Sequence, residues 1–389
     1  MKVLHIGKYF PPYAGGMETY LRDLMAAQGR QGIGAFALVH QSGIGFKSQD
    51  ETYNAGEQAL SVTRAAVWAR LLFTPISPTF PWLLRQLIKK DQPDILHLHM
   101  PNVSVFWALL LPSARKISWV IHWHSDVLAS AHHTGLRLFY ALYRPFERAV
   151  LRKSAAIIAT SPPYLESSEP LRDFSEKCHV VPLGLAPANT SPRASFDEAP
   201  DTAGSLRVLA VGRLTYYKGF EYLIRAAALV EDIEVNLVGT GDLDKSLRDL
   251  AQELGVDQRV TFHGHLSDGE LEQQYDSCDC LCLPSIERTE AFGMVLLEAM
   301  SHSRATVVSA VPGSGMAWVA EDGITGLHVL SKDAHSLANC LRNLRDNRDK
   351  IRALGGSCRE KFDLLFQIDK SAAEVSSLYR DILDLPARQ

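Results

Sequence analysis

Two carboxylates flank a predicted helix start within residues 285–299, SIERTEAFGMVLLEA. A short apolar strand in residues 280–283 ends before this stretch, and a helix pattern begins at Gly293, so the loop feeds a helix N-terminus. Backbone N–H groups in a first helical turn lack intrahelical partners and attract phosphate or another anion. Glu290 precedes this anion site, and Glu298 follows Gly293 by roughly 7.5 Å of helix. The two carboxylates could therefore bind hydroxyl groups at the two ends of a diphosphate.

A second loop places two cations between glycines. Residues 212–219, GRLTYYKG, follow a predicted strand in residues 206–211 and precede a helix that begins at Phe220. Arg213 and Lys218 could clamp a diphosphate and stabilise its charge as a bond to phosphate breaks. The alternative is a pair of solvated basic side chains.

The first half of the chain has two similar elements. A buried strand in residues 3–7 leads into a loop with Gly15 and Gly16, where the missing side chains permit close backbone approach to an anion. His124 follows the fourth predicted strand, at the carboxyl edge where sheets of this kind bind their ligands, although a structural histidine is the alternative. Asp126 could contact an acceptor or orient His124.

Apolar strands alternate with helical patterns along the whole chain, which is typical of parallel sheets covered by helices. At 389 residues the chain is long enough for two hydrophobic cores. The alternation restarts after residues 186–204, a stretch with three prolines and almost no large apolar side chain, which we interpret as a linker. The sequence therefore predicts an α/β protein of two doubly wound domains, residues 1–185 and 205–367, followed by a helix in residues 368–389.

Charge is unevenly divided between these domains. Residues 1–185 carry 19 Lys and Arg against 13 Asp and Glu, whereas the whole chain has a net charge of −4. A basic first domain suggests an anionic partner such as a diphosphate, a glycolipid or a membrane surface, unless the asymmetry is without function. The predicted helix in residues 135–153 mixes basic and aromatic side chains and would suit an anionic membrane, although a plain amphipathic helix has the same spacing.

No stretch of the sequence resembles a signal peptide or reaches the length of a membrane-spanning helix. We therefore expect a cytoplasmic protein, with peripheral contact to the cytoplasmic face of the inner membrane as an option. Cys278, Cys280 and Cys282 alternate along one strand face, unlike the paired cysteines of a zinc site, so no metal is expected. Residues 239–241 form a bare G-x-G, which does not support nicotinamide binding.

In their order along the chain, these elements resemble the retaining GT-B glycosyltransferases of family 4. The matching motifs are G-G-x-E from Gly15, the His-Ser pair at His124, G-R-x4-K-G from Gly212 and E-x7-E from Glu290. The resemblance covers nearly the whole chain. It implies two Rossmann-like domains that face a cleft and a last helix that crosses back onto the first domain.

The resemblance also implies roles for individual residues. His124, which we favour over His122, would face the donor sugar, and Glu290 would bind hydroxyls of that sugar. Arg213 and Lys218 would bind the leaving diphosphate. The other implied donor contacts lie in the glycine loop, at the helix start and at the ribose: Gly15, Gly16, Phe292, Gly293, Met294, Val295 and Glu298.

The donor base is held by the turn near residue 268 in members of this family. Asp268 could accept hydrogen bonds from guanine N1 and N2, which uracil cannot offer, although Ser267 or Asp268 could instead cap the following helix. Four stretches are most similar to bacterial surface-polysaccharide transferases that use GDP-mannose or GDP-rhamnose: residues 123–126, 161–171, 216–219 and 288–293.

The resemblance therefore implies a retaining hexosyltransferase that needs neither metal nor cofactor. It would move mannose from GDP-mannose, bound by the second domain, to a lipid-linked glycan bound by the first, in polysaccharide or lipopolysaccharide synthesis. Three alternatives remain: a transferase that uses UDP-sugars, a nucleotide-sugar epimerase or phosphorylase on the same fold, and a non-catalytic partner that binds nucleotide sugars.

Overall fold

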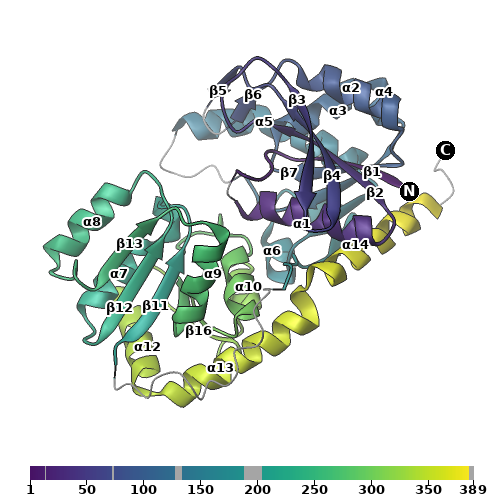
Figure 1. Cartoon of the computed structure of the whole chain (residues 1–389). Helices are drawn as coiled ribbons and strands as arrows, with labels where there is room; N and C mark the ends of the chain where they lie inside the picture. Colours follow the sequence, from purple (N-terminus) through teal and green to yellow (C-terminus); the bar gives the residue numbers. More distant parts are fainter. Residues whose placement is uncertain (14, 72–73, 128–133, 188–203, 385–389) are drawn as a thin grey trace. The chain divides into compact units, whose positions relative to one another are not determined.

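The computed structural model describes residues 1–13, 15–71, 74–127, 134–187 and 204–384, and the side chains of residues 134–138 are not among the features described. Two compact units make up the chain (Figure 1). Unit 1 comprises Met1–Ala186 and Ile368–Gln389, and unit 2 comprises Pro187–Gln367. Most of the predicted linker, residues 188–203, lies outside the described residues. Within the described part of the chain, no helix is long and apolar enough to cross a membrane.

The main sheet of unit 1 has the strand order β10-β9-β8-β7-β1-β2-β4-β3, and its strands pair in parallel except for β3 with β4. The strands are β1 (Lys2–Ile6), β2 (Gly34–His40), β3 (Gln49–Ala55), β4 (Gln58–Ala65), β7 (Ile95–Met100), β8 (Ser118–Trp123), β9 (Ala156–Ala159) and β10 (Cys178–Val180). A separate antiparallel pair joins β5 (Ala69–Leu71) and β6 (Thr74–Ile76). The helices are α1 (Gly16–Arg30), α2 (Phe80–Asp91), η1 (Val103–Phe106), α3 (Trp107–Leu110), α4 (Pro112–Arg115), α5 (Thr134–Lys153), α6 (Pro162–Ser167), η2 (Arg172–Lys177) and α14 (Ile368–Asp384).

The hairpin of β3 and β4 is absent from the sequence prediction. Strand β3 reads QDETYNA, and its side chains are exposed or only half-buried because it forms the edge of the sheet. Such a strand carries no apolar signal, and its position is set by pairing, for example of Tyr53 with Leu60.

Unit 2 contains a fully parallel sheet of order β13-β12-β11-β14-β15-β16. Its strands are β11 (Leu206–Val211), β12 (Ile233–Val238), β13 (Val260–Gly264), β14 (Cys280–Leu283), β15 (Ala305–Ser309) and β16 (Gly326–Val329). Its helices are η4 (Tyr216–Lys218), α7 (Phe220–Ala228), α8 (Asp244–Glu253), α9 (Asp268–Ser277), α10 (Met294–Ser301), α11 (Met316–Val319), α12 (Ala334–Asp346), α13 (Arg348–Lys361) and the π-helix η5 (Phe362–Phe366). The predicted pair of doubly wound α/β units is confirmed.

Each sheet has a point where the chain order reverses. In unit 2 the chain moves from β11 outward to β12 and β13, and then returns to the other side of β11 with β14. In unit 1 the same reversal separates β2 from β7, on the two sides of β1. The loops that leave neighbouring strands at such a point diverge to opposite faces of the sheet, so ligands bind at the carboxyl ends there. The loop with Arg213 and Lys218, which we call the cationic loop, follows β11, and the loop with Glu290 follows β14.

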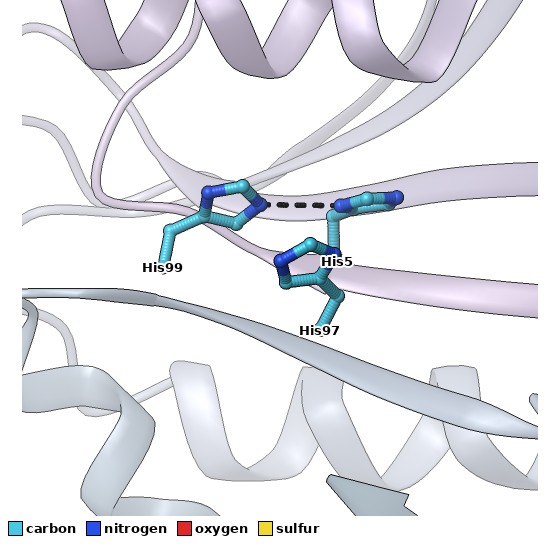
Figure 2. Close-up of side chains that lie close together, drawn as sticks. All are labelled: His5, His97 and His99. Carbon is cyan, nitrogen blue, oxygen red and sulfur yellow. Dashed lines mark hydrogen bonds between the residues drawn. The ribbon is translucent and has the colours of Figure 1, made fainter. Parts of the chain in front are cut away.

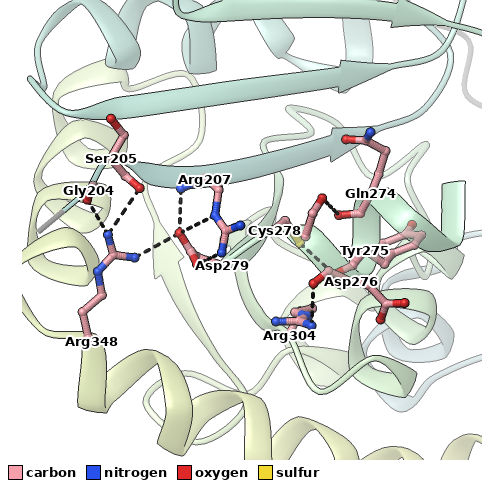
Figure 3. A network of polar contacts seen from close by, with 11 residues as sticks. Gly204, Ser205, Arg207, Gln274, Tyr275, Asp276, Cys278, Asp279, Arg304 and Arg348 are labelled. Carbon is pink, nitrogen blue, oxygen red and sulfur yellow. Dashed lines mark hydrogen bonds and ion pairs between the residues drawn. The ribbon is translucent and has the colours of Figure 1, made fainter. Parts of the chain in front are cut away.

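The opposite, amino-terminal edge of the unit 2 sheet is closed by an ionic network (Figure 3). The Asp279 carboxylate accepts from the backbone N–H of Arg207 at 2.8 Å, from the Arg207 guanidinium at 2.9 Å and from Arg348 at 3.0 Å. Burial opposes ionisation of Asp279, but these hydrogen bonds outweigh it and lower its pKa. The network joins the amino-terminal ends of β11 and β14 and so helps to fix the positions of their carboxyl ends.

The last helix, α14, packs on α1 of unit 1, as predicted for a helix that crosses back to the first domain. Ala372, Val375 and Tyr379 of α14 are fully buried. Polar contacts join the same two helices: the Tyr20 hydroxyl lies 2.9 Å from Ser371 Oγ, and Ser376 Oγ donates to Gln31 Oε1 at 2.7 Å. The polar contacts fix the register of α14 on α1, because a shifted helix would leave these groups without partners.

Two glycines after β12 let its loop pack on the cationic loop after β11. A Cβ added to Gly239, whose φ is +138°, would lie 1.9 Å from the carbonyl oxygen of Gly212. A Cβ on Gly241 would lie 2.3 Å from the carbonyl oxygen of Leu214. The G-x-G motif therefore serves backbone packing beneath Arg213.

Gly239→Ala is expected to lower the free energy of unfolding by about 2–4 kcal/mol, because the new methyl group clashes with backbone and the backbone angle is strained. Urea unfolding measures this loss. Gly255→Ala is the control: its φ is also positive, at +67°, but the space around it is open, so only about 1 kcal/mol should be lost. Equal losses for the two variants would contradict the packing role.

Candidate active site

A buried ion pair joins the two loops at the reversal point of unit 2. Lys218 Nζ lies 2.5 Å from Glu290 Oε2, and Ser285 Oγ donates to the same oxygen at 3.3 Å. Gly219 makes this approach possible, since a Cβ there would stand 2.2 Å from the carbonyl oxygen of Pro284. The loops after β11 and β14 are thus in backbone contact, and two predicted site residues meet.

Lys218 keeps its charge in this position although only 7% of its surface is exposed. Burial opposes the charge, but the neighbouring Glu290 carboxylate outweighs burial, and the pKa of Lys218 is raised. The Arg213 guanidinium, by contrast, acts to lower the pKa of Lys218, and the Arg213 side chain is exposed. The loop therefore holds one buried, neutralised cation and one exposed cation, which together can bind a diphosphate.

The Glu290 loop ends at the amino terminus of α10. Gly293 is the N-cap residue with a φ of +84°, and no side chain in the described part of the chain caps the helix. The Phe292 side chain is buried against Trp318 and Phe366, at ring-centroid distances of 6.4 and 6.0 Å. Phe292 therefore anchors the loop through its ring, while the first turn of α10, with the half-buried Met294 and Val295, presents backbone amides suited to an anion.

Glu298 lies one turn further along α10 and accepts a hydrogen bond of 2.5 Å from the Tyr275 hydroxyl. Burial raises the pKa of Glu298, and the Asp268 carboxylate adds to the effect, whereas Tyr275 and Lys218 oppose it. Tyr275 is not among the residues predicted from the sequence, because a tyrosine on a helix is most often a core residue. Five charged candidates, Arg213, Lys218, Asp268, Glu290 and Glu298, thus interact within unit 2.

The two residues proposed to cap α9 have different positions. Ser267 is the N-cap residue and forms a capping box with Glu270, whose carboxylate accepts from the Ser267 backbone at 2.8 Å. Asp268 is the first helical residue and is exposed. Since Ser267 caps the helix, the Asp268 carboxylate stays available for a ligand.

In unit 1, Gly15 is the N-cap residue of α1 and Gly16 its first residue, and no described side chain caps this helix. The buried Glu18 carboxylate lies over Gly15, where an added Cβ would stand 2.2 Å from Glu18 Oε2. A side chain at position 15 would therefore displace Glu18. Four residues after Gly16, Tyr20 packs its ring at 6.0 Å from that of His124, which links the glycine loop to the end of β8.

Asp126 anchors the loop after β8. Its carboxylate accepts from Trp123 Nε1 at 2.8 Å and from Ser168 Oγ at 2.7 Å, and its backbone N–H donates to the Tyr164 hydroxyl at 2.6 Å. Asp126 is 6% exposed. These contacts fix the chain directly after His124.

Five buried imidazoles line the face of the unit 1 sheet beneath α1 and α14. We call them the histidine layer: His5 on β1, His97 and His99 on β7, and His122 and His124 at the end of β8. Burial is the largest cause that lowers the pKa of each imidazole, to about 4 for His5 and about 3 for His124. The layer is therefore uncharged at neutral pH.

The histidine layer is poorly arranged for a shared metal ion, although two sets of three histidines have ligand nitrogens within 4.8 Å of one another. The rings of His97 and His99 are nearly parallel, at 12° and 4.5 Å between centroids, and those of His122 and His124 at 11° and 4.5 Å. An imidazole binds metal in its ring plane, so parallel stacked rings do not direct lone pairs to one point. Instead, His5 and His99 join edge to edge through a hydrogen bond (Figure 2).

Comparison with known proteins adds three kinds of similarity. Residues 194–360 match the family described as glycosyl transferases group 1, and residues 15–184 match the glycosyl transferase 4-like domain. O-antigen chain mannosyltransferase C of Escherichia coli is 29% identical over 99% of both chains, and D-rhamnosyltransferase WbpZ of Pseudomonas aeruginosa is 27% identical over 94% of this chain and 92% of its own. Sucrose-phosphate synthase from Thermosynechococcus elongatus has a similar fold, with a TM-score of 0.81 over 99% of this chain and 100% of its own at 23% identity.

Stability is expected to fall as the pH drops from about 6.5 toward 4. The unfolded chain binds protons on its histidines in this range, whereas the histidine layer and the buried His40 remain neutral in the folded protein. Glu147, whose pKa is raised to about 7, contributes in the opposite sense, as do Glu298 and Glu374, but the lowered imidazoles outnumber them.

His122→Leu tests how much one of these histidines contributes to the pH dependence of stability. Neither ring nitrogen of His122 has a hydrogen-bond partner among the described residues, so the substitution should leave stability at pH 7.5 unchanged or higher. Between pH 5 and 6.5 it should reduce the slope of unfolding free energy against pH by up to roughly 1.4 kcal/mol per unit. His335→Leu, at an exposed histidine, controls for the loss of a side chain. An unchanged slope in His122→Leu would show that the folded state already carries this proton.

Proposed function

The chain belongs to the group 1 glycosyltransferases, and we propose that it transfers mannose from GDP-mannose to a lipid-linked glycan with retention of configuration and without a metal ion. The single observation that carries the proposal is the Lys218–Glu290 pair at the reversal point of unit 2, next to Arg213 and the uncapped start of α10. These groups supply positive charge where a diphosphate leaves and a carboxylate where a sugar hydroxyl binds.

The contacts of unit 2 support a division of the donor among neighbouring residues. Arg213, Lys218 and the first amides of α10 bind the diphosphate, so that its growing charge is stabilised as the bond from sugar C1 to the phosphate oxygen breaks. Glu290 turns from Lys218 toward the sugar once phosphate oxygens replace it as the partner of the cation. Glu298, positioned by Tyr275, binds the ribose.

Retention follows from a same-face displacement in this proposal. The acceptor oxygen forms its bond to C1 on the side from which the diphosphate departs, and the acceptor proton passes to the leaving phosphate oxygen. Two cations and the helix start take the place that a divalent ion has in other diphosphate sites. No nucleophilic carboxylate and no cofactor takes part.

Mannose and guanine are proposed on two grounds. Relatives aligned over almost the full chain carry the names mannosyltransferase and rhamnosyltransferase, and the first of them acts on the O-antigen chain. Asp268 is exposed at the first turn of α9 and electrostatically coupled to Glu298, which suits a carboxylate that reads the N1 and N2 hydrogens of guanine. A UDP-sugar donor is the alternative, and it would leave Asp268 without this partner.

Membrane contact is proposed for unit 1 at the surface of α2, α3 and α4, which lie side by side. Its exposed apolar side chains are Trp82, Trp107 and Leu110, and its exposed cations are Arg85, Lys89, Lys90, Arg115 and Lys116. On α5, by contrast, Arg144 and Arg148 form ion pairs of 2.7 Å with Glu169 and Asp173. Exposed aromatic side chains together with exposed cations suit an anionic lipid surface.

The donor is tested by thermal unfolding with GDP, UDP, ADP and their sugars, each with and without EDTA. We expect GDP and GDP-mannose to raise the melting temperature most, and EDTA to have no effect. Stabilisation by UDP-sugars but not by GDP-mannose would refute the choice of donor. Loss of binding or turnover in EDTA would refute the metal-independent site.

Arg213→Gln should lower kcat for mannosyl transfer to a simple alkyl mannoside by about 10²–10³-fold, because one group that stabilises the leaving charge is lost. The fold should be unaffected, since Arg213 is exposed. Arg225→Gln, at an exposed arginine on α7, is the matched control and should keep full activity. An α-linked product, identified by NMR, supports retention, and a β-linked product contradicts it.

Binding to vesicles that contain phosphatidylglycerol should weaken at least tenfold in the double variant Trp82→Ala/Trp107→Ala, because two aromatic anchors are lost. Flotation with the vesicles measures this. Leu330→Ala, at an exposed apolar residue of unit 2, is the control. Equal flotation of both variants would place membrane contact elsewhere.

A further inference from the structure

A chain of hydrogen bonds runs through the histidine layer to His124. Gln28 Oε1 lies 2.9 Å from His5 Nε2, His5 Nδ1 lies 3.2 Å from His99 Nε2, and His99 Nδ1 lies 3.0 Å from His124 Nε2. All four side chains are buried. Figure 2 shows the His5–His99 link, in which the two rings meet through their nitrogens. His5 and His99 thus each use one nitrogen on the side of Gln28 and the other on the side of His124.

The amide of Gln28 determines which nitrogen of each ring donates in this series of hydrogen bonds. Its Nε2 donates to the Tyr379 hydroxyl at 3.3 Å, so its Oε1 is the atom that faces His5. The Tyr379 hydroxyl in turn hydrogen-bonds to His97 Nδ1. An amide oxygen can only accept, which requires the hydrogen of His5 to be on Nε2.

Because each imidazole is neutral, the donor and acceptor nitrogens of His5 determine those of His99 and His124. A neutral ring has one N–H, so Nδ1 of His5 accepts and Nε2 of His99 must donate. By the same rule, Nδ1 of His99 accepts, and Nε2 of His124 carries the hydrogen. Burial lowers the pKa of each of these imidazoles, which keeps every ring in the required neutral form.

We propose that Gln28, His5 and His99 are positioning residues that fix His124 as the Nε2–H tautomer, so that its Nδ1 accepts a hydrogen bond from a hydroxyl of the donor sugar. The inference rests on the proposed function and on the family resemblance, which implies that His124 faces the donor sugar. His124 Nδ1 is buried and has no hydrogen-bond partner among the described residues. A sugar hydroxyl supplies the missing donor, and binding it satisfies an acceptor that the unliganded protein leaves unpaired.

The assignment gives His124 a defined chemical role. As an uncharged acceptor it selects a ligand O–H and rejects a ligand atom that can only accept, such as a carbonyl or an ether oxygen. It neither donates a proton nor carries positive charge toward the leaving diphosphate. The last helix takes part in this selection, because Tyr379 of α14 holds the Gln28 amide in its orientation.

Nitrogen NMR of the ¹⁵N-histidine-labelled protein at pH 7.5 tests the tautomer without any ligand. We expect a protonated, pyrrole-type Nε2 and an unprotonated, pyridine-type Nδ1 for His124, with assignments from single substitutions of the layer. A protonated Nδ1 in the wild-type protein would overturn the proposal, because the chain of hydrogen bonds would then run in the opposite direction.

Gln28→Met tests the origin of the tautomer, since methionine has a similar shape and no carbonyl oxygen. The ¹⁵N chemical shifts of His124 should change to values that indicate a mixture of tautomers. The kcat/KM for GDP-mannose should fall about tenfold, the size expected for the loss of one neutral hydrogen bond. The Kd of GDP, which lacks the sugar, should stay the same. Gln28→Glu keeps an accepting oxygen and should restore the Nε2–H tautomer.

Gln31→Met is the matched control, because Gln31 also binds α14, through Ser376, and the hydrogen bonds described for it do not reach the histidine layer. It should leave the His124 spectrum and the kinetics unchanged. A wild-type His124 spectrum in Gln28→Met would overturn the proposal. If Gln28→Met does not fold, Tyr379→Phe takes its place, and an unmixed spectrum there contradicts the role of the amide orientation. A wild-type protein that binds neither GDP nor GDP-mannose would refute the proposed function, while the spectra of the unliganded protein still decide the tautomer.

Discussion

A lysine buried beside a carboxylate at the reversal point of a parallel sheet is the constraint on which the site of unit 2 depends. Without Glu290, burial would lower the pKa of the Lys218 amine, because it disfavours the charged form. The pair requires the loops after β11 and β14 to touch, which Gly219 permits. The Asp279 network holds the other ends of the same strands (Figure 3). A ligand with more negative charge than Glu290 can then take over the cation in a site that is already assembled.

Unit 1 follows the opposite electrostatic principle. Its strand ends carry a layer of imidazoles that burial keeps neutral, and polarity there is expressed through hydrogen bonds and tautomers rather than charge. Tyr379 of the last helix is hydrogen-bonded to Gln28, and Gln28 begins the series of hydrogen bonds that ends directly after β8. Unit 1 thus offers uncharged hydrogen-bonding groups at its strand ends, whereas unit 2 offers charged side chains.

The sequence was sufficient to predict the elements and loops that repeat a local pattern. Apolar runs marked most of the strands that form the two main sheets, and glycines next to charged residues marked the loops that contain Arg213 and Glu290. It was insufficient where a residue acquires its role from a distant partner. Tyr275 meets Glu298 across 23 positions, and Gln28 meets Tyr379 across 351, so neither pair has a local signature. Edge strand β3 was missed because its side chains are polar.

The most direct test of the central claim is a crystal structure of the protein with GDP. We predict diphosphate oxygens within hydrogen-bond distance of Lys218 Nζ and the Arg213 guanidinium, with the Lys218–Glu290 bond opened and the nucleotide ribose beside Glu298. A nucleotide bound at another part of the chain, or an intact Lys218–Glu290 pair beneath a diphosphate that touches neither cation, would contradict the account.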